Sequence, residues 1–502
     1  MALKPNRLYY GDCLDWMEQW EDNCVDLIYL DPPFNSKTNY NMLFAGLDDS
    51  EVQYRAFTDT WSWNDVAGER YGAYEAAVGR PGRGAVVGLY QILGGCGMIA
   101  YLTYMAERLA EMHRILKPTG SIYLHCDPTA SHYLKIVMDD IFDKANFRNE
   151  IVWYYENRLS RKGGQFSRLH DTILVYGKSG KTVHNLIYDE NWTPSPTQAR
   201  RLERGYEVRK GDLIIYDEEK FAKSGIDESG YAKVYRSKAK QPPLGDVWPV
   251  PILNPMAKER LGYATQKPLA LLERIIKASS NEGDLVLDPF CGCGTAIEAA
   301  HLLNRQWAGI DISSFAIDLI RRERPHLKNL NIQAERIPKN MRDAHALALD
   351  NRLAFEAWAV DRLPGFAPNT KQTGDKGVDG RGKLAHDPDD FDSRLALAQV
   401  KSGAKVSPSD LRDFIGTMDI QEAAIGRFIT LEPVTSGDMH KDAASLGSVS
   451  VLGESYPRLK LWSIRDYFNH QPPMLPDMMN PYKRGAVMDA KQRHMVFNLR
   501  ES

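Results

Sequence analysis

The chain has 502 residues, 43% of them hydrophobic and 26% charged, so it is long enough for two or three domains of an ordinary globular protein. Its net charge of −3 lacks the strongly basic balance of a protein that binds nucleic acid over its whole surface. No apolar run reaches the roughly 18 residues of a membrane span, no secretory signal begins the chain, and six cysteines without a C-x-x-C pair argue against zinc and for a reducing cytoplasm.

The first expected strand covers residues 25–30 and leads directly into Asp31, Pro32, Pro33 and Phe34. At the end of a parallel strand these residues suit a flat ring that carries an amino group. The carboxylate and the two carbonyls of Asp31 and Pro32 can accept hydrogen bonds from an exocyclic NH2, and Phe34 offers a face for stacking. A lone Asp-Pro-Pro-Phe would also form an ordinary turn, so the interpretation depends on a second motif downstream.

Residues 68–97 carry nine glycines in thirty positions, which predicts a mobile surface insertion, either a lid near the crevice or a loop without a role. An amphipathic helix is expected over 102–116, because apolar residues recur there at spacings of three and four. Strands are expected over 121–126 and 170–176. This alternation of strands and helices favours a mostly parallel sheet.

Residues 151–240 hold 17 Lys and Arg against 12 Asp and Glu. Within this surplus, Arg158, Arg161, Lys162 and Arg168 could follow a phosphate backbone, although charge alone fits a solvated face equally well. Residues 177–262 lose clear periodicity and gain turns, prolines and charges, so by position they form a candidate recognition region.

The second motif is an apolar strand ending at Asp288, followed by a loop with Phe290, Gly292, Gly294 and Thr295 and then by a helix. A strand, a tight glycine turn and a helix form the nucleotide-binding corner of a doubly wound sheet. The loop lacks both the G-x-G-x-x-G spacing of a dinucleotide site and the Gly-Lys-Ser/Thr of a P-loop. Asp311 follows Asp288 by 23 residues at the end of the next strand, where an acid commonly takes ribose hydroxyls. The alternative is a plain βαβ unit with incidental glycines.

With both motifs in place, residues 6–335 resemble the β class of S-adenosylmethionine-dependent DNA amino-methyltransferases, which includes type III modification subunits. The resemblance implies that Asp31 to Phe34 form the catalytic motif and that the loop after Asp288 binds the methionine part of the cofactor. It also implies that Asp311 binds the ribose and that Asp12, with Cys13 beside it, meets the adenine. Asp rather than Ser at the first catalytic position favours adenine N6 over cytosine N4, and Phe34 stands where Tyr is more usual.

The C-terminal part, residues 345–468, resembles the Mrr-like branch of the PD-(D/E)xK nucleases. Asp379, Gln399 and Lys401 carry the match, and Glu356 is a helix acid that could join them. Gln399 and Lys401 lie on a strand expected over 395–401. In this interpretation Asp379 holds Mg2+ and Lys401 stabilises the attacking hydroxide. The alternative is a surface pair in a non-catalytic DNA-binding module. Residues 469–502 are expected to form a partly ordered tail.

The sequence therefore predicts an α/β protein: a doubly wound, mostly parallel sheet with an inserted recognition region, followed by a second α/β domain resembling a nuclease. The expected activity is methylation of a flipped base in double-stranded DNA, as in restriction–modification. Three alternatives stay open for the activity: a non-catalytic C-terminal module, a cytosine N4 target and an RNA substrate. Two partners also stay possible, a second copy in a homodimer and a restriction or specificity subunit. C5-cytosine methylation is excluded, because it needs a Pro-Cys nucleophile and no Pro-Cys occurs in the chain.

Overall fold

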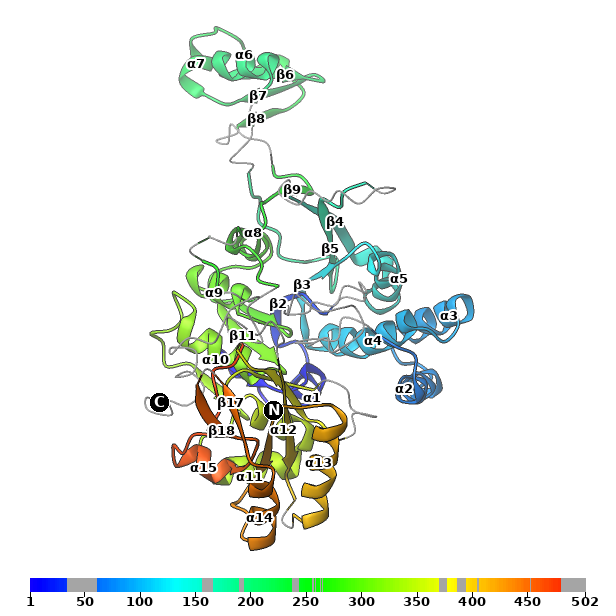
Figure 1. The fold of residues 1–502 in the computed structure, drawn as a ribbon. Helices are drawn as coiled ribbons and strands as arrows, with labels where there is room; N and C mark the ends of the chain where they lie inside the picture. Colours follow the sequence, from blue (N-terminus) through cyan, green and yellow to red (C-terminus); the bar gives the residue numbers. More distant parts are fainter. Residues whose placement is uncertain are drawn as a thin grey trace. The chain divides into compact units, whose positions relative to one another are not determined.

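The computed structural model describes most of the chain (Figure 1). The described residues are 1–33, 61–155, 166–188, 194–236, 243–254, 257, 259–261, 263, 265–369, 377–385, 394–403, 406–451 and 453–479. Phe34, Arg158, Arg161 and Lys162 lie outside them. The chain divides into two compact units, one formed by 1–183 with 249–502 and the other by 184–248. No helix within the described ranges is both long and apolar enough to cross a bilayer.

The larger unit contains a long mixed sheet whose strands run in the order β12, β1, β11, β10, β2, β3, β5, β4. Their bounds are β1 (Arg7–Tyr10), β2 (Val25–Leu30), β3 (Leu116–Cys126), β4 (Phe147–Tyr154), β5 (His170–Gly177), β10 (Leu285–Asp288), β11 (Gln306–Asp311) and β12 (Gln333–Glu335). Neighbours from β12 to β3 pair in parallel, whereas β5 is antiparallel to both β3 and β4. The predicted mostly parallel sheet is confirmed, and its strand order reverses between β2 and β10, where such sheets bind ligands.

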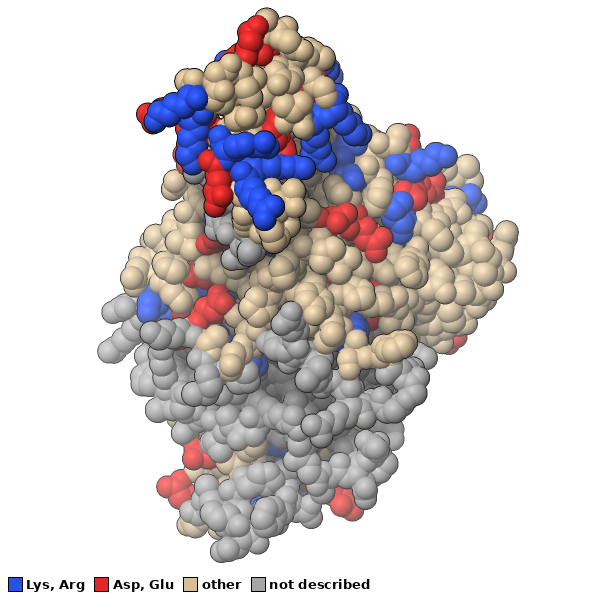
Figure 2. Space-filling model, turned by 90° about the horizontal axis from the view of Figure 1, so that it is seen from above, with Lys and Arg blue, Asp and Glu red and all other residues tan. Residues whose placement is uncertain are grey.

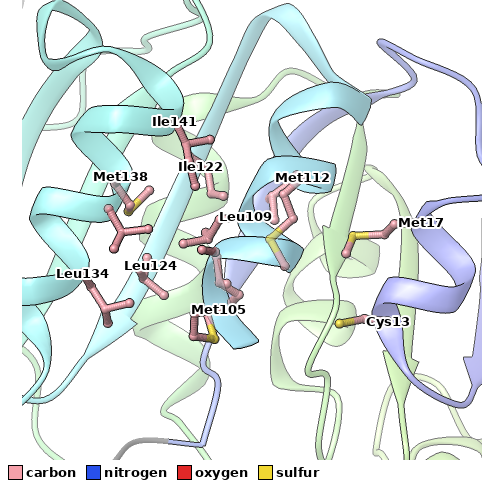
Figure 3. Packing of buried hydrophobic residues seen from close by; sticks show 14 of the residues in the cluster. Cys13, Met17, Met105, Leu109, Met112, Ile122, Leu124, Leu134, Met138 and Ile141 are labelled. Atoms are coloured by element: carbon pink, nitrogen blue, oxygen red, sulfur yellow. The ribbon is translucent and has the colours of Figure 1, made fainter. Parts of the chain in front are cut away.

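Helices cover this sheet through side chains at helical spacing. Their bounds are α1 (Cys13–Met17), α4 (Gly97–Ile115), α5 (Ser131–Phe142), η1 (Lys144–Asn146), α8 (Leu269–Ser279), α9 (Thr295–Leu302) and α10 (Ser314–Glu323). Met105, Leu109 and Met112 of α4 are fully buried and pack between β3, α1 and α5 (Figure 3). Burying each such side chain stabilises the fold by about 1.5–3 kcal/mol. The amphipathic helix predicted from these residues is confirmed.

The glycine-rich segment 68–97 is helical, so the prediction of a mobile insertion is wrong. It contains α2 (Asp65–Ala76), α3 (Arg83–Leu93) and the first residue of α4. Tyr74 and Val86 are fully buried in the main core. Gly82 and Gly94 adopt left-handed φ angles of +81° and +67° at the two ends of α3, where glycine avoids backbone strain. Gly82 and Gly94 therefore mark the two ends of a helix in a packed segment.

Residues 184–248 form a small unit of their own. It contains α6 (Pro196–Arg204), α7 (Glu218–Ala222), η2 (Glu228–Gly230), β6 (Tyr206–Arg209), β7 (Asp212–Ile215) and β8 (Val234–Arg236), while β9 (Val247–Pro249) lies at its border. Leu213, Ile215 and Phe221 form its core. The unit lies within the expected recognition region, 177–262.

The C-terminal part folds around a five-stranded sheet in the order β13, β14, β15, β16, β19. Its strands are β13 (Phe366–Pro368), β14 (Gly380–Lys383), β15 (Leu395–Lys401), β16 (Ile425–Thr430) and β19 (Leu459–Ser463), and β17 (Ser448–Val451) pairs with β18 (Glu454–Pro457). Its helices are α11 (Met341–Asp350), α12 (Arg352–Val360), α13 (Pro408–Ile420), α14 (Gly437–Ser445) and α15 (Ile464–Phe468). The strand expected at 395–401 is confirmed.

The beginning of the predicted tail packs against this sheet. Arg427 of β16 is buried and donates from Nε to the carbonyl of Pro473 at 2.8 Å. Met478 is 1% exposed and lies in the core cluster that includes Trp358. The first part of 469–502 is therefore structural, and residues 480–502 lie outside the described chain.

A buried junction joins α12 to α10. Ser314 Oγ donates to Asp361 Oδ2 at 2.6 Å, and Arg362 Nη1 lies 3.2 Å from Asp318 Oδ2. The hydroxyl of Tyr10, at the end of β1, donates a hydrogen bond to the carbonyl of Ala354 at 2.6 Å. The two predicted domains thus share a polar interface.

Candidate active site

Four carboxylates meet at one edge of the large sheet. Asp31, Asp288 and Asp311 stand at the carboxyl ends of β2, β10 and β11, which are parallel neighbours. Asp12 follows β1, the next strand along. The carboxyl ends of parallel strands lie on the same side of a sheet, so residues almost 300 positions apart in sequence line one cavity.

The cavity has a volume of about 1040 Å3, part of it open to solvent. Its walls combine the predicted residues with aromatic and basic side chains from other elements. They are Asp12, Cys13, Tyr29, Asp31, Pro32, Pro33, Tyr104, Tyr263, Thr265, Gln266, Lys267, Leu272, Asp288, Pro289, Phe290, Cys291, Gly292, Cys293, Thr295, Ala296, Asp311 and Ile312. Every cofactor residue predicted from the sequence is therefore on this surface, except Gly294.

Gly294 supports the loop from behind. Its φ is +78°, and a Cβ at this position would lie 2.7 Å from Cγ1 of Ile320, so a side chain would strain the backbone and clash with α10. Gly292, with φ +49°, faces Tyr263 and donates its backbone N–H to Asp311 Oδ2 at 2.8 Å. The glycines thus shape the loop and connect it to the acid on β11.

Asp288 and Asp311 are both buried. Burial raises the pKa of Asp288 well above its ordinary value, despite the N–H that Phe290 donates to its Oδ1. Burial also raises the pKa of Asp311 to about 6; the N–H groups of Ser313 and Gly292 lower it, and the nearby Asp361 raises it. The carboxyl of Asp311 therefore titrates close to neutral pH.

Asp12 is held by a buried arginine that the sequence interpretation missed. Arg108 of α4 is 1% exposed, forms an ion pair with Asp12 and lies with its guanidinium carbon 3.3 Å from the centre of the Tyr104 ring. The other carboxylate oxygen of Asp12 accepts the N–H of Leu14 and caps α1. Burial raises the pKa of the neighbouring Cys13 thiol to about 12, so this thiol is neutral. The sequence held one signal for this contact, which was an arginine between the apolar positions of the predicted helix.

Asp31 lies among further charged residues. Lys267 forms an ion pair with its Oδ2, and His125 Nδ1 lies 3.5 Å from its Oδ1. Oδ1 is buried and accepts no hydrogen bond within the part of the chain that the structure describes. An acceptor without a donor at the edge of a cavity is suited to an incoming N–H group. Lys267 belongs to the segment before α8, and its pairing over 236 residues was not predicted.

Arg168 stands near this cluster rather than on a free basic stripe. Its Nη2 lies 2.5 Å from Asp171 Oδ1, and its Nη1 lies 3.5 Å from Asp127 Oδ2. Two carboxylates therefore offset its charge. The three other predicted phosphate-binding residues fall outside the described chain.

In the C-terminal sheet, Asp379 and Gln399 are brought together at the start of β14 and the end of β15. Asp379 Oδ2 accepts the N–H of Val400 at 2.7 Å, and the buried Gln399 Oε1 has no hydrogen-bond partner among the described residues. Lys401 instead lies 3.1 Å from Asp410, and Glu356 accepts a 2.6 Å hydrogen bond from Arg352. The described residues include no group of three or more His, Cys, Asp or Glu side chains placed to hold a metal.

Comparisons with known proteins agree with this division. The family model described as DNA methylase matches residues 25–322, more than half of the chain, and a model described as restriction endonuclease matches 355–451. The Mod subunit of the type III restriction-modification enzyme StyLTI from Salmonella typhimurium is 27% identical over 61% of this chain and 51% of its own length. The DNA adenine methyltransferase YhdJ of Escherichia coli K12 is 25% identical over 61% of this chain and 78% of its own length.

This chain thus spans about half the length of the type III subunit that it matches. Among solved structures, the complex of M1.HpyAVI with SAM is 16% identical and covers 65% of this chain and 99% of its own, with a TM-score of 0.33.

Proposed function

Because this chain belongs to the DNA methylase family, we propose that it transfers a methyl group from S-adenosylmethionine to the exocyclic amino group of a flipped DNA base, with adenine N6 as the target. The observation that carries the proposal is that Asp31 and the glycine loop after Asp288 end adjacent parallel strands and line one cavity. Asp31 can receive the amino group there, next to a loop that can hold the methyl donor.

The residues present fit this cofactor. The cavity offers the buried carboxylate of Asp311 for ribose hydroxyls and Asp12 beside Tyr104 for the adenine. Gly292 leaves space that a Cβ would fill, 3.2 Å from the Tyr263 ring. When bound, the cofactor supplies an electrophilic methyl on a sulfonium. The work left to the protein is to position the amino nitrogen in line with that methyl and to exclude water.

Asp31 positions the nitrogen. The amino group donates one N–H to Asp31 Oδ1 and, as the sequence predicts, another to the carbonyl of Pro32, which opposes delocalisation of the nitrogen lone pair into the ring. Lys267 holds the other oxygen of Asp31 and fixes the direction of the carboxylate. Flipping the base costs a few kcal/mol, and stacking on Phe34 would offset about 1–3 kcal/mol of this.

Residues 184–248 are the proposed recognition unit. Lys and Arg side chains gather in the upper part of the view in Figure 2. Within this unit, exposed basic residues lie at the end of α6 (Arg200 and Arg204) and at the turn between β6 and β7 (Arg209 and Lys210). Such residues suit contacts to DNA phosphates. A homodimer and a separate restriction or specificity subunit stay predictions.

The test is expression in a methylation-free bacterial host, followed by single-molecule sequencing of the host DNA. The wild-type chain should produce N6-methyladenine at a defined motif. Asp31→Ala should abolish the mark while cofactor binding persists, and Asp22→Ala, which removes an exposed acid paired with Arg114, should leave it unchanged. N4-methylcytosine would correct the target base. No modified base would contradict the proposal and direct the assay to RNA.

The C-terminal domain is proposed as a Mg2+-dependent DNA endonuclease. Asp379 and the unpartnered Gln399 Oε1 would hold the ion, since oxygen ligands suit Mg2+, and Lys401 would stabilise the hydroxide. Asp379→Asn and Lys401→Met should each abolish cleavage of DNA and leave methylation intact, with Arg412→Met, on the exposed face of α13, as the control. Full cleavage by both variants would mean that these residues are structural.

A further inference from the structure

A buried histidine stands directly behind Asp31. His125 lies near the end of β3 and is fully buried. Its Nδ1 is 3.5 Å from Asp31 Oδ1, and its Nε2 is 3.4 Å from Asp171 Oδ2 on β5. The imidazole thus lies between the carboxylate in the cavity and a second carboxylate on β5.

Neighbouring side chains fix this ring. The indole of Trp153 on β4 meets it edge to face, with ring centres 5.4 Å apart, and Tyr29 Oη lies 3.3 Å from its Nδ1. The same Asp31 oxygen that is free to accept an amino N–H is therefore the oxygen that faces His125.

Charged and titratable groups from several elements surround Asp31 and Asp171, the two carboxylates on either side of His125. Lys267 faces Asp31 from the segment before α8, and Asp288 faces Tyr29. Asp171 is faced by Arg168, just before β5, and by Tyr155, just after β4. Burial alone would raise the pKa of Asp171, but its interaction with His125, together with Arg168, holds this pKa well below its usual value. Asp171 therefore stays ionised and can stabilise a proton on His125.

We propose that His125 is a positioning residue that receives, through Asp31, the proton lost by the methylated amino group. This inference rests on the proposed methyl transfer. The nitrogen lone pair forms a bond to the methyl carbon as the carbon–sulfur bond breaks, which leaves a neutral thioether and a positively charged nitrogen. That nitrogen loses a proton to Asp31 Oδ1, and the proton passes to Nδ1 of neutral His125, which becomes an imidazolium between two carboxylates.

Among the described residues, the other neighbours of Asp31 are not placed to take this proton. Lys267 as an ammonium has three donors and no acceptor, and Asp31 Oδ1 is buried from solvent. Tyr29 can donate to the Nδ1 lone pair before transfer, which keeps that nitrogen unprotonated. Because an imidazolium cannot accept a second proton at Nδ1, only neutral His125 supports transfer, and the rate should fall on the acid side.

The test is single-turnover methyl transfer to duplex DNA that contains the mapped motif, measured against pH for the full chain. His125→Gln should slow transfer about 100-fold, the lower end of the usual contribution of a positioned acid or base, and should remove the acid limb of the profile. Its affinity for S-adenosylhomocysteine should stay within twofold of wild type. His113→Gln makes the same change at a histidine that packs against Phe142, and it should keep the wild-type rate and profile.

Two further variants separate this role from a structural one. His125→Ala should regain part of its rate with added imidazole, and Asp171→Asn, which keeps the shape but removes the charge, should move the acid limb to lower pH. A wild-type rate and profile in His125→Gln would overturn the proposal, as would equal losses of rate and cofactor affinity. If the wild-type chain transfers no methyl group to DNA, the proposed function itself fails.

Discussion

The titration of Asp311 should control cofactor affinity. Binding ribose hydroxyls needs the carboxylate form of Asp311, because only that form accepts at both oxygens without donating. Burial raises its pKa to about 6, so the carboxylate is largely present at pH 7 and lost as the pH falls through 6. At pH 5 about one tenth of the group is ionised, and affinity should be about tenfold weaker than at pH 7, equivalent to about 1.4 kcal/mol.

The measurement is calorimetric titration with S-adenosylhomocysteine at half-unit steps from pH 5 to pH 8. Asp311→Asn is the control, because it removes this titration and leaves those of Asp288 and of the ligand. The variant should bind weakly, and its affinity should change less with pH than that of the wild type. Parallel pH curves for the two proteins would refute the assignment of the titration to Asp311 and with it the ribose contact.

Two substitutions test the packing around the site by urea denaturation. Arg362→Met should reduce the free energy of unfolding by about 3–5 kcal/mol, because the buried Asp318 carboxylate loses its buried partner and is left with Arg321 at 3.6 Å. Arg458→Met, whose partner is largely exposed, should reduce it by at most about 1 kcal/mol. Equal reductions would contradict a buried junction. Gly294→Ala should reduce the free energy of unfolding by about 1–3 kcal/mol more than Gly283→Ala does. Both glycines have left-handed φ angles, but only Gly294 faces a close neighbour. A smaller or absent difference would mean that α10 moves aside.

The sequence predicted the elements whose signals are local. The strand at 25–30 and the strand at 395–401 have the predicted bounds. Apolar periodicity and chain order were sufficient for these. The segment 68–97 was mistaken because glycine count was taken as disorder, whereas Tyr74, Val86 and their neighbours bury that segment against the core.

The site was predicted in its motifs and not in the charges around them. Asp31 and Asp311 follow strands, so sequence placed both at one sheet edge. The partners Lys267, Arg108 and His125 come from other elements, and only the fold brings them to the carboxylates. A sequence pattern identifies which acid ends a strand, but it does not say which distant base offsets its charge.

The junction between α10 and α12 changes how the two proposed activities can be separated. Asp311 immediately precedes α10, and Ser314 and Asp318 on that helix bond to Asp361 and Arg362. Ending the chain at residue 335 would remove the partners that Ser314 and Asp318 find in the two residues directly after α12. It would also remove the acceptor of the Tyr10 hydroxyl, two residues before Asp12. A truncated chain that fails to methylate would therefore report a damaged cofactor site rather than a requirement for cleavage. Substitutions at Asp379 and Lys401 leave the junction intact, so these variants can test the nuclease activity independently of methyl transfer.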